Sequence, residues 1–117
     1  MIIADHPIMQ DSLRRLFRQQ ADMDLVSELH AARELLTELR RCHPDILLID
    51  LQIPPGEAKH AIRCVRAVSP LAPIIVLTTY PWESVNFYPG DPGTLVLVSK
   101  TAPGDEVLAA VRQAATR

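Results

Sequence analysis

The chain has 117 residues, of which 48% are hydrophobic, and its formal net charge is −2. This length suits one compact domain with a substantial core, and the hydrophobic share excludes a disordered chain. A charge near zero gives no general attraction to nucleic acid, so this domain itself is not expected to bind DNA. No apolar stretch approaches the roughly 20 residues that span a membrane, and no signal peptide is evident. Cys42 and Cys64 have no metal-ligand spacing and are expected to be reduced thiols of a cytoplasmic protein.

Strands and helices are predicted to alternate along the first third of the chain. A short apolar run that begins at Met1 ends at Asp5 and predicts the first strand. Apolar residues recur at helical spacing over residues 7–20, which predicts a helix with one apolar stripe. A short second strand is expected over residues 24–29, followed by a second helix over residues 31–42.

The most informative segment is the run of four apolar residues from Ile46 to Ile49, which ends at Asp50. The run is too short for a buried helix and indicates a strand buried on both faces, as in a parallel sheet. Asp50 follows at the carboxyl end of this strand, where open α/β sheets place their ligands. A carboxylate there can act as a nucleophile or bind a metal. It can equally cap the strand or begin a turn.

The second half of the chain continues the alternation. A third apolar helical stripe runs from Ala58 to Val68, and β-branched residues before Thr78 predict a fourth strand. A fifth apolar run ends at Lys100, and the last helix follows Pro103, a residue suited to the start of a helix. In a parallel sheet the carboxyl ends of the strands share one edge. Polar residues stand at four of these ends, and we expect them to share one crevice: Asp5, Asp50, Thr78 and Lys100.

Residues 80–93 interrupt the alternation. They contain three prolines, two glycines and Trp82, the only tryptophan. Because proline in a helix costs about 3 kcal/mol and glycine about 1, at most one helical turn is expected here. The aromatic residues of this segment either pack onto the edge of the sheet or form a surface for a partner or ligand.

The four polar strand ends resemble those of the receiver domain of bacterial two-component response regulators. The segments Asp5-His6-Pro7 and Leu77-Thr78-Thr79-Tyr80 are most similar to receivers that precede a LuxR/NarL-type helix-turn-helix domain. The resemblance implies a flavodoxin-like, doubly wound, five-stranded parallel sheet in the order 2-1-3-4-5, with the fourth helix shortened or missing. Residues 1–117 would form a single receiver domain, without the C-terminal DNA-binding output domain.

The resemblance also implies the roles of the site residues and the partners. A histidine kinase would transfer a phosphoryl group to Asp50, the phosphoacceptor, so the domain is not itself expected to be an enzyme. Asp5, Asp50 and the backbone carbonyl of Gln52 would hold Mg²⁺. Lys100 would pair with the phosphoryl group or with Asp50, and the Thr78 hydroxyl would hydrogen-bond the phosphoryl group. DNA would be contacted only through the output domain.

Two residues depart from the family pattern. Ala4 occupies a position where the family has a second acid, which predicts weaker Mg²⁺ binding because affinity follows ligand charge. Leu97 stands where an aromatic switch residue is usual. These departures leave a second interpretation open, a pseudo-receiver that binds a protein or ligand independently of phosphorylation. A third, a flavodoxin-like enzyme or flavin carrier, is disfavoured because the loop after the first strand lacks a phosphate-binding cradle.

The charges on the first and last helices permit a homodimer. Arg14, Arg15 and Arg18 lie on the first helix, and Asp105 and Glu106 lie on the last. An isologous dimer would bring the first helix of each chain against the last helix of its mate. Because such peripheral charge pairs steer association more than they strengthen it, a weak and salt-sensitive dimer is predicted.

Overall fold

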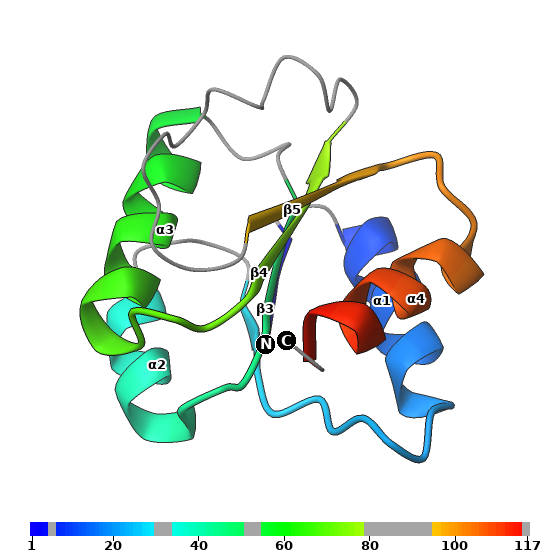
Figure 1. The fold of residues 1–117 in the computed structure, drawn as a ribbon, viewed down its shortest axis with the longest axis horizontal. Helices are drawn as coiled ribbons and strands as arrows, with labels where there is room; N and C mark the ends of the chain where they lie inside the picture. Colours follow the sequence, from blue (N-terminus) through cyan, green and yellow to red (C-terminus); the bar gives the residue numbers. More distant parts are fainter. Residues whose placement is uncertain (5–6, 30–33, 51–54, 79–94, 116–117) are drawn as a thin grey trace.

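A computed structural model of the chain describes residues 1–4, 7–29, 34–50, 55–78 and 95–115 (Figure 1). The prediction of an irregular segment over residues 80–93 lies outside these residues. In the described part of the chain, five parallel strands form one sheet in the order β2-β1-β3-β4-β5. This confirms the predicted flavodoxin-like fold and its strand order. The strands are β1 (Ile2–Ile3), β2 (Glu28–Leu29), β3 (Leu47–Asp50), β4 (Ile74–Thr78) and β5 (Leu95–Ser99).

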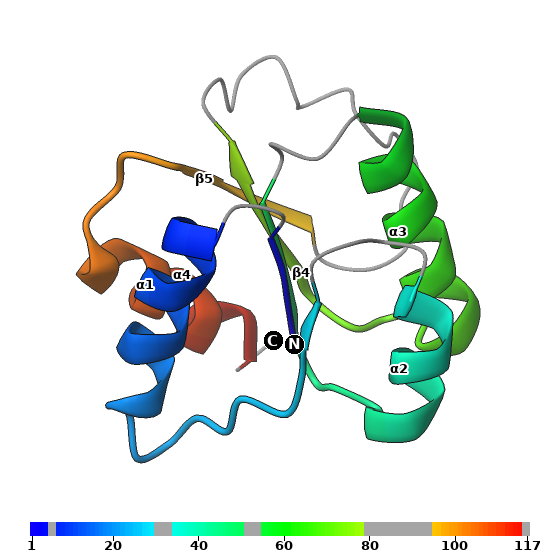
Figure 2. The ribbon, with the colours of Figure 1, turned by 180° about the vertical axis from the view of Figure 1, so that it is seen from behind.

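Helices cover both faces of the sheet, with α1 and α4 on one side and α2 and α3 on the other (Figures 1 and 2). All four helices lie within or overlap the segments that were predicted to be helical. Helix α1 begins with Pro7, whose missing N–H is harmless at a helix start. None of the described helices is long and apolar enough to cross a membrane. The helices are α1 (Pro7–Arg18), α2 (Leu35–Cys42), α3 (Pro55–Val68) and α4 (Gly104–Ala115).

Strand residues alternate between two hydrophobic clusters because successive side chains of a strand point to opposite faces. Leu47 and Ile49 of β3 belong to the cluster beneath α2 and α3. Leu48, between them, belongs to the cluster beneath α1 and α4, together with Phe17 and Val107. The strand from Leu47 to Asp50 is buried throughout, which confirms a central buried strand. It is shifted by one residue from the predicted run, because Ile46 is half-buried and precedes the strand.

The second strand is shorter than predicted. Residues 24–29 were expected to be extended, whereas β2 comprises only Glu28 and Leu29. A strand needs a neighbour to satisfy its backbone, and β1 pairs with β2 only at Ile2 and Ile3. The extent of β2 is thus fixed by its partner rather than by its own apolar pattern.

Polar contacts connect the helices to the sheet and to the loops. On α2, Glu38 accepts hydrogen bonds from Arg41 and from the Ser27 hydroxyl before β2, which lowers the pKa of Glu38 to about 2. His43 directly follows the last helical residue, Cys42; its φ of 45° is left-handed, and its N–H donates to the Leu39 carbonyl at 2.9 Å. A left-handed residue of this kind closes the last turn and redirects the chain toward β3.

Candidate functional site

Three of the predicted site residues lie at the carboxyl edge of the sheet. In the strand register, Asp50 at the end of β3 is level with Leu77 of β4, and Leu77 is level with Val98 of β5. Thr78 ends β4 one residue further along, and Lys100 directly follows β5. The sheet therefore brings these three positions to one edge, as the parallel arrangement predicted. The side chain of Thr78 and the whole of Asp5 and Gln52 lie outside the described part of the structure.

The Asp50 carboxylate and the Lys100 ammonium form an ion pair through Oδ1 and Nζ. Leu48, two residues before Asp50, and Val98, two before Lys100, both pack on the α1/α4 side. The side-chain period of β3 thus directs Asp50 toward that face. The ion pair brings the Lys100 ammonium, from the turn after β5, to the same carboxylate. The Asp50 side chain is 0% exposed and that of Lys100 only 10%. A carboxylate at this depth requires a cation or hydrogen bonds to remain charged.

Ala4 lies beside Asp50 in the sheet. Ile3 pairs with Ile49, so the next residues, Ala4 and Asp50, are level with each other at the strand ends. Ala4 is completely buried in the hydrophobic cluster between the sheet and α1/α4. The position where the family has a second acid is therefore filled by a methyl group packed among apolar side chains.

The described donors fit a divalent cation only in part. Mg²⁺ prefers oxygen ligands in octahedral geometry, and Asp50 offers a hard carboxylate oxygen at the carboxyl edge of the sheet. Ala4 contributes no oxygen, and no group of three or more His, Cys, Asp or Glu side chains converges in the described ranges. The two other predicted ligands, Asp5 and the Gln52 carbonyl, lie outside these ranges.

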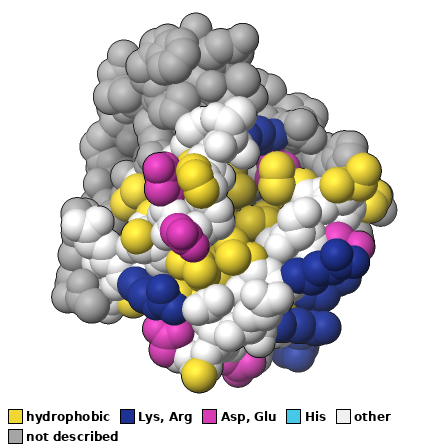
Figure 3. Space-filling model, turned by 90° about the vertical axis from the view of Figure 1, so that its right-hand side faces the viewer, with side chains coloured by type: hydrophobic (Ala, Val, Ile, Leu, Met, Phe, Trp, Pro, Cys, Tyr) yellow, Lys and Arg dark blue, Asp and Glu magenta, His cyan; other side chains and the backbone are white. Residues whose placement is uncertain are grey.

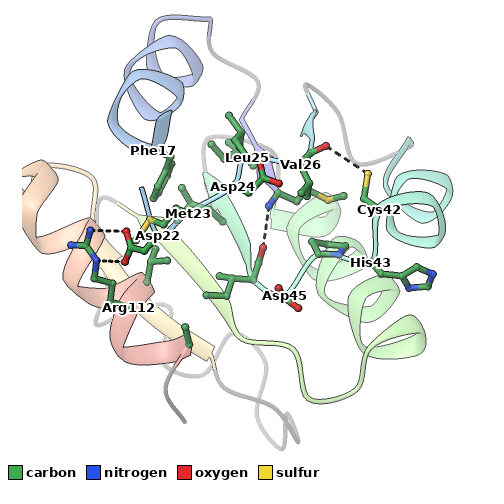
Figure 4. A pocket seen from close by; sticks show the side chains of 17 residues that line it. Phe17, Asp22, Met23, Asp24, Leu25, Val26, Cys42, His43, Asp45 and Arg112 are labelled. Carbon is green, nitrogen blue, oxygen red and sulfur yellow. Dashed lines mark hydrogen bonds and ion pairs between the residues drawn. The ribbon is translucent and has the colours of Figure 1, made fainter. Parts of the chain in front are cut away.

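A cavity of about 460 Å³ lies at the opposite, amino-terminal edge of the sheet (Figure 4). It lies between the loop after α1, the loop after α2 and the end of α4. At its border Arg112 of α4 pairs with Asp22 at 2.9 Å. None of the predicted site residues lines this cavity. The carboxyl edge at Asp50 and this cavity are therefore separate features of the molecule.

Sequence reasoning missed one feature of the carboxyl edge. The hydroxyls of Ser99 and Thr101, on either side of Lys100, lie 2.8 Å apart and share a hydrogen bond. The only signal in the sequence is the pattern Ser-Lys-Thr at the end of an apolar run. Because hydroxyl residues are common where loops begin, that pattern alone does not distinguish a structural pair from two solvated side chains.

The fold and the Asp50–Lys100 pair define a receiver domain. The chain matches the response regulator receiver domain family over residues 1–112, and so it belongs to that family. It is a receiver domain of two-component systems. A two-component response regulator of the LuxR family is among its structural neighbours, which agrees with the resemblance found in the sequence.

Two relatives and one solved structure illustrate the similarity. The oxygen regulatory protein NreC of Staphylococcus haemolyticus is 29% identical over 113 residues, covering 96% of this chain and 52% of NreC. The transcriptional regulatory protein YxjL of Bacillus subtilis is 25% identical over 111 residues, covering 95% of this chain and 51% of YxjL. The crystal structure of a LuxR-family response regulator from Aurantimonas matches with a TM-score of 0.83 and 26% identity, covering 99% and 83% of the two chains. The chain spans about half the length of the curated relatives it matches.

Proposed function

We propose that this receiver accepts a phosphoryl group on Asp50 from a phosphohistidine of a histidine kinase in the cytoplasm. The observation that carries the proposal is the ion pair between Asp50 and Lys100 at the carboxyl edge of the sheet. In the transfer, the N–P bond of the phosphohistidine breaks as a P–O bond forms to an Asp50 carboxylate oxygen. The imidazole leaves with the electron pair of the broken bond. The domain is a phosphoacceptor and not an enzyme acting on other molecules.

The chemistry requires positive charge at the carboxylate, because one anion attacks another. Lys100 supplies one such charge in direct contact with Asp50. As the phosphoryl group arrives, the ammonium can pair with a phosphoryl oxygen at the same edge. When bound, Mg²⁺ supplies further positive charge, and Asp5, Asp50 and the Gln52 carbonyl are the residues that would hold it. The hydroxyl of Thr78 would hydrogen-bond the phosphoryl group from the end of β4.

The proposed output is transcriptional. The curated relatives are about twice as long as this chain, and a regulator of the LuxR family is among its structural neighbours. We therefore assign the receiver a C-terminal helix-turn-helix domain as its partner, through which DNA is contacted. Phosphorylation of Asp50 would control that domain.

A second candidate is a pseudo-receiver that acts as an interaction or ligand-binding module without phosphorylation. Two observations favour it. The Asp50 side chain is fully buried against Lys100, and Ala4 supplies no acid to a metal site. Both reduce the access of a phosphoryl donor and of Mg²⁺ to the carboxylate.

Incubation with acetyl phosphate and millimolar Mg²⁺, followed by intact-mass measurement, separates the two candidates. The phosphorylatable receiver gains the mass of one phosphoryl group, and Asp50→Asn abolishes the gain because the nucleophilic carboxylate is lost. Asp45→Asn, which alters an exposed carboxyl before β3, is the matched control and leaves the gain intact. An unchanged mass in the wild type would favour the pseudo-receiver instead.

A weak, salt-sensitive homodimer is also expected through α1 and α4. Figure 3 shows hydrophobic side chains at the centre of this face, Lys and Arg side chains mainly along its right-hand border, and Asp and Glu side chains mainly along its left and lower borders. Arg15 and Arg18 are exposed on α1, and Asp105 and Glu106 are exposed on α4. Arg14, the third predicted basic residue, is instead bound to its own chain.

Sedimentation velocity at low and high salt tests this dimer. Arg15→Glu combined with Arg18→Glu should reduce association at low salt, because the exchanged charges would repel the acidic start of α4. Arg40→Glu, a change to an exposed arginine of α2 on the other face, should leave association unaltered. A strict monomer at high protein concentration and low salt would exclude the dimer.

A further inference from the structure

The turn after β5 is closed by hydrogen bonds on both sides of Lys100. The Ser99 hydroxyl oxygen lies 2.8 Å from the Thr101 hydroxyl and accepts the Thr101 backbone N–H at 3.2 Å. The Ala102 N–H donates to the Ser99 carbonyl at 3.0 Å, which completes a turn over residues 99–102. Lys100 is therefore the one charged residue in a short segment whose backbone is held at both ends. We call the side chains of Ser99 and Thr101 the hydroxyl pair.

The hydroxyl pair and the ion pair share the backbone of Lys100. Its ammonium reaches the buried Asp50, while Thr101 lies exposed on the surface. Ordering a lysine side chain and its backbone has a large entropic cost, which is smaller when the backbone is already fixed. A buried ion pair is favourable only when its geometry is good. A fixed backbone at Lys100 should therefore stabilise its ion pair with Asp50.

We propose that Ser99 and Thr101 are positioning residues that hold Lys100 against Asp50. The hydroxyl pair does not touch the carboxylate and acts only through the lysine backbone. Its role in holding the ion pair is independent of phosphorylation. Its role in phosphoryl transfer rests on the function proposed above for Asp50.

The same turn leads directly into α4. The N–H groups of Glu106 and Val107 donate to the Pro103 carbonyl as the helix begins. Gly104 lies against α1, where an added Cβ would be 3.0 Å from a methyl group of Leu16. The segment from Ser99 to Gly104 therefore connects the hydroxyl pair to the contact between α4 and α1. The backbone amide of Gly104 provides a reporter at that contact.

A double-mutant cycle tests positioning without any phosphoryl donor. Ser99→Ala should lower the urea midpoint of unfolding in the wild-type background and have much less effect when Lys100→Met is present. Ser99→Ala should likewise change the chemical shift of the Gly104 amide in the wild-type background and change it much less when Lys100→Met is present. Ser12→Ala, which removes an exposed hydroxyl on α1, is the matched control and should leave the midpoint unchanged in both backgrounds. If Lys100→Met does not fold, Asp50→Asn provides the second background, because it removes the other charge of the pair.

An equal lowering by Ser99→Ala in both backgrounds would show a purely structural hydroxyl and overturn the proposal. No lowering in the wild-type background would overturn it as well. Ser99→Thr keeps a hydroxyl at the same position and should have the same urea midpoint of unfolding as the wild type.

Phosphorylation kinetics provide the second arm. With acetyl phosphate, Ser99→Ala should reduce the maximal rate about fivefold, the ratio that one ordinary hydrogen bond represents. The Mg²⁺ concentration for half-maximal rate should not change, because the hydroxyl pair contributes no metal ligand. An unchanged maximal rate would overturn the role in transfer. If the wild type gains no phosphoryl group, the function proposed for Asp50 fails, and the mutant cycle alone decides the positioning role.

Discussion

Replacing Lys100 with methionine should lower the free energy of unfolding by about 3–5 kcal/mol, the range seen when one partner of a buried ion pair is removed. The Asp50 side chain is 0% exposed, so the variant leaves a carboxylate in the interior without its lysine. Methionine has a similar length and retains the packing of the aliphatic stem, so the loss reports the charge. Urea unfolding with linear extrapolation measures the change.

Two companion variants make this expectation specific. Arg15→Met removes an exposed cation from α1 and should change the free energy of unfolding by less than about 0.5 kcal/mol. The double variant Asp50→Leu with Lys100→Met removes both charges and should recover most of the loss, since apolar replacements of buried pairs are often neutral. If Lys100→Met behaved like Arg15→Met, the pair would contribute no more than an ordinary surface contact.

The sheet could be predicted because its central strands are buried on both faces. The run from Ile46 to Ile49 contains no polar residue, and such a run in a chain of alternating strands and helices specifies a central parallel strand. Once the strands are parallel, their carboxyl ends must share an edge. The contact between Asp50 and Lys100 follows from that topology, although the two residues are far apart in the sequence. The topology thus predicted that the two residues share one edge, and the resemblance to the family implied that they pair.

Other features depend on tertiary contacts that sequence patterns do not contain. The second strand was predicted to be longer than it is, because an apolar pattern does not indicate where a neighbouring strand ends. The hydroxyl pair of Ser99 and Thr101 depends on a turn geometry that many sequences could adopt. For Ala4 the sequence showed a missing acid. The structure adds that the position is enclosed by apolar side chains, which changes what a restored acid would do there.

Ala4→Asp should therefore have opposite effects on stability and on Mg²⁺ binding. Without Mg²⁺, the new carboxylate would lie in an apolar cluster and beside Asp50, and we expect the free energy of unfolding to fall by about 3 kcal/mol or more. With Mg²⁺, part of that loss should be regained, because a ligand that binds only the folded state stabilises it. The Mg²⁺ affinity should exceed that of the wild type, since the site gains a charged oxygen ligand.

Urea unfolding at several Mg²⁺ concentrations, combined with calorimetric titration, measures both effects. Ala4→Asn is the matched control, because it adds a side chain of the same size and polarity but no charge. It should destabilise the fold and show no gain in Mg²⁺ affinity over the wild type. The wild type should itself bind Mg²⁺ weakly, because Ala4 offers no oxygen beside Asp50. Tight Mg²⁺ binding by the wild type, with no increase in Ala4→Asp, would show that charge at this position does not limit the metal site.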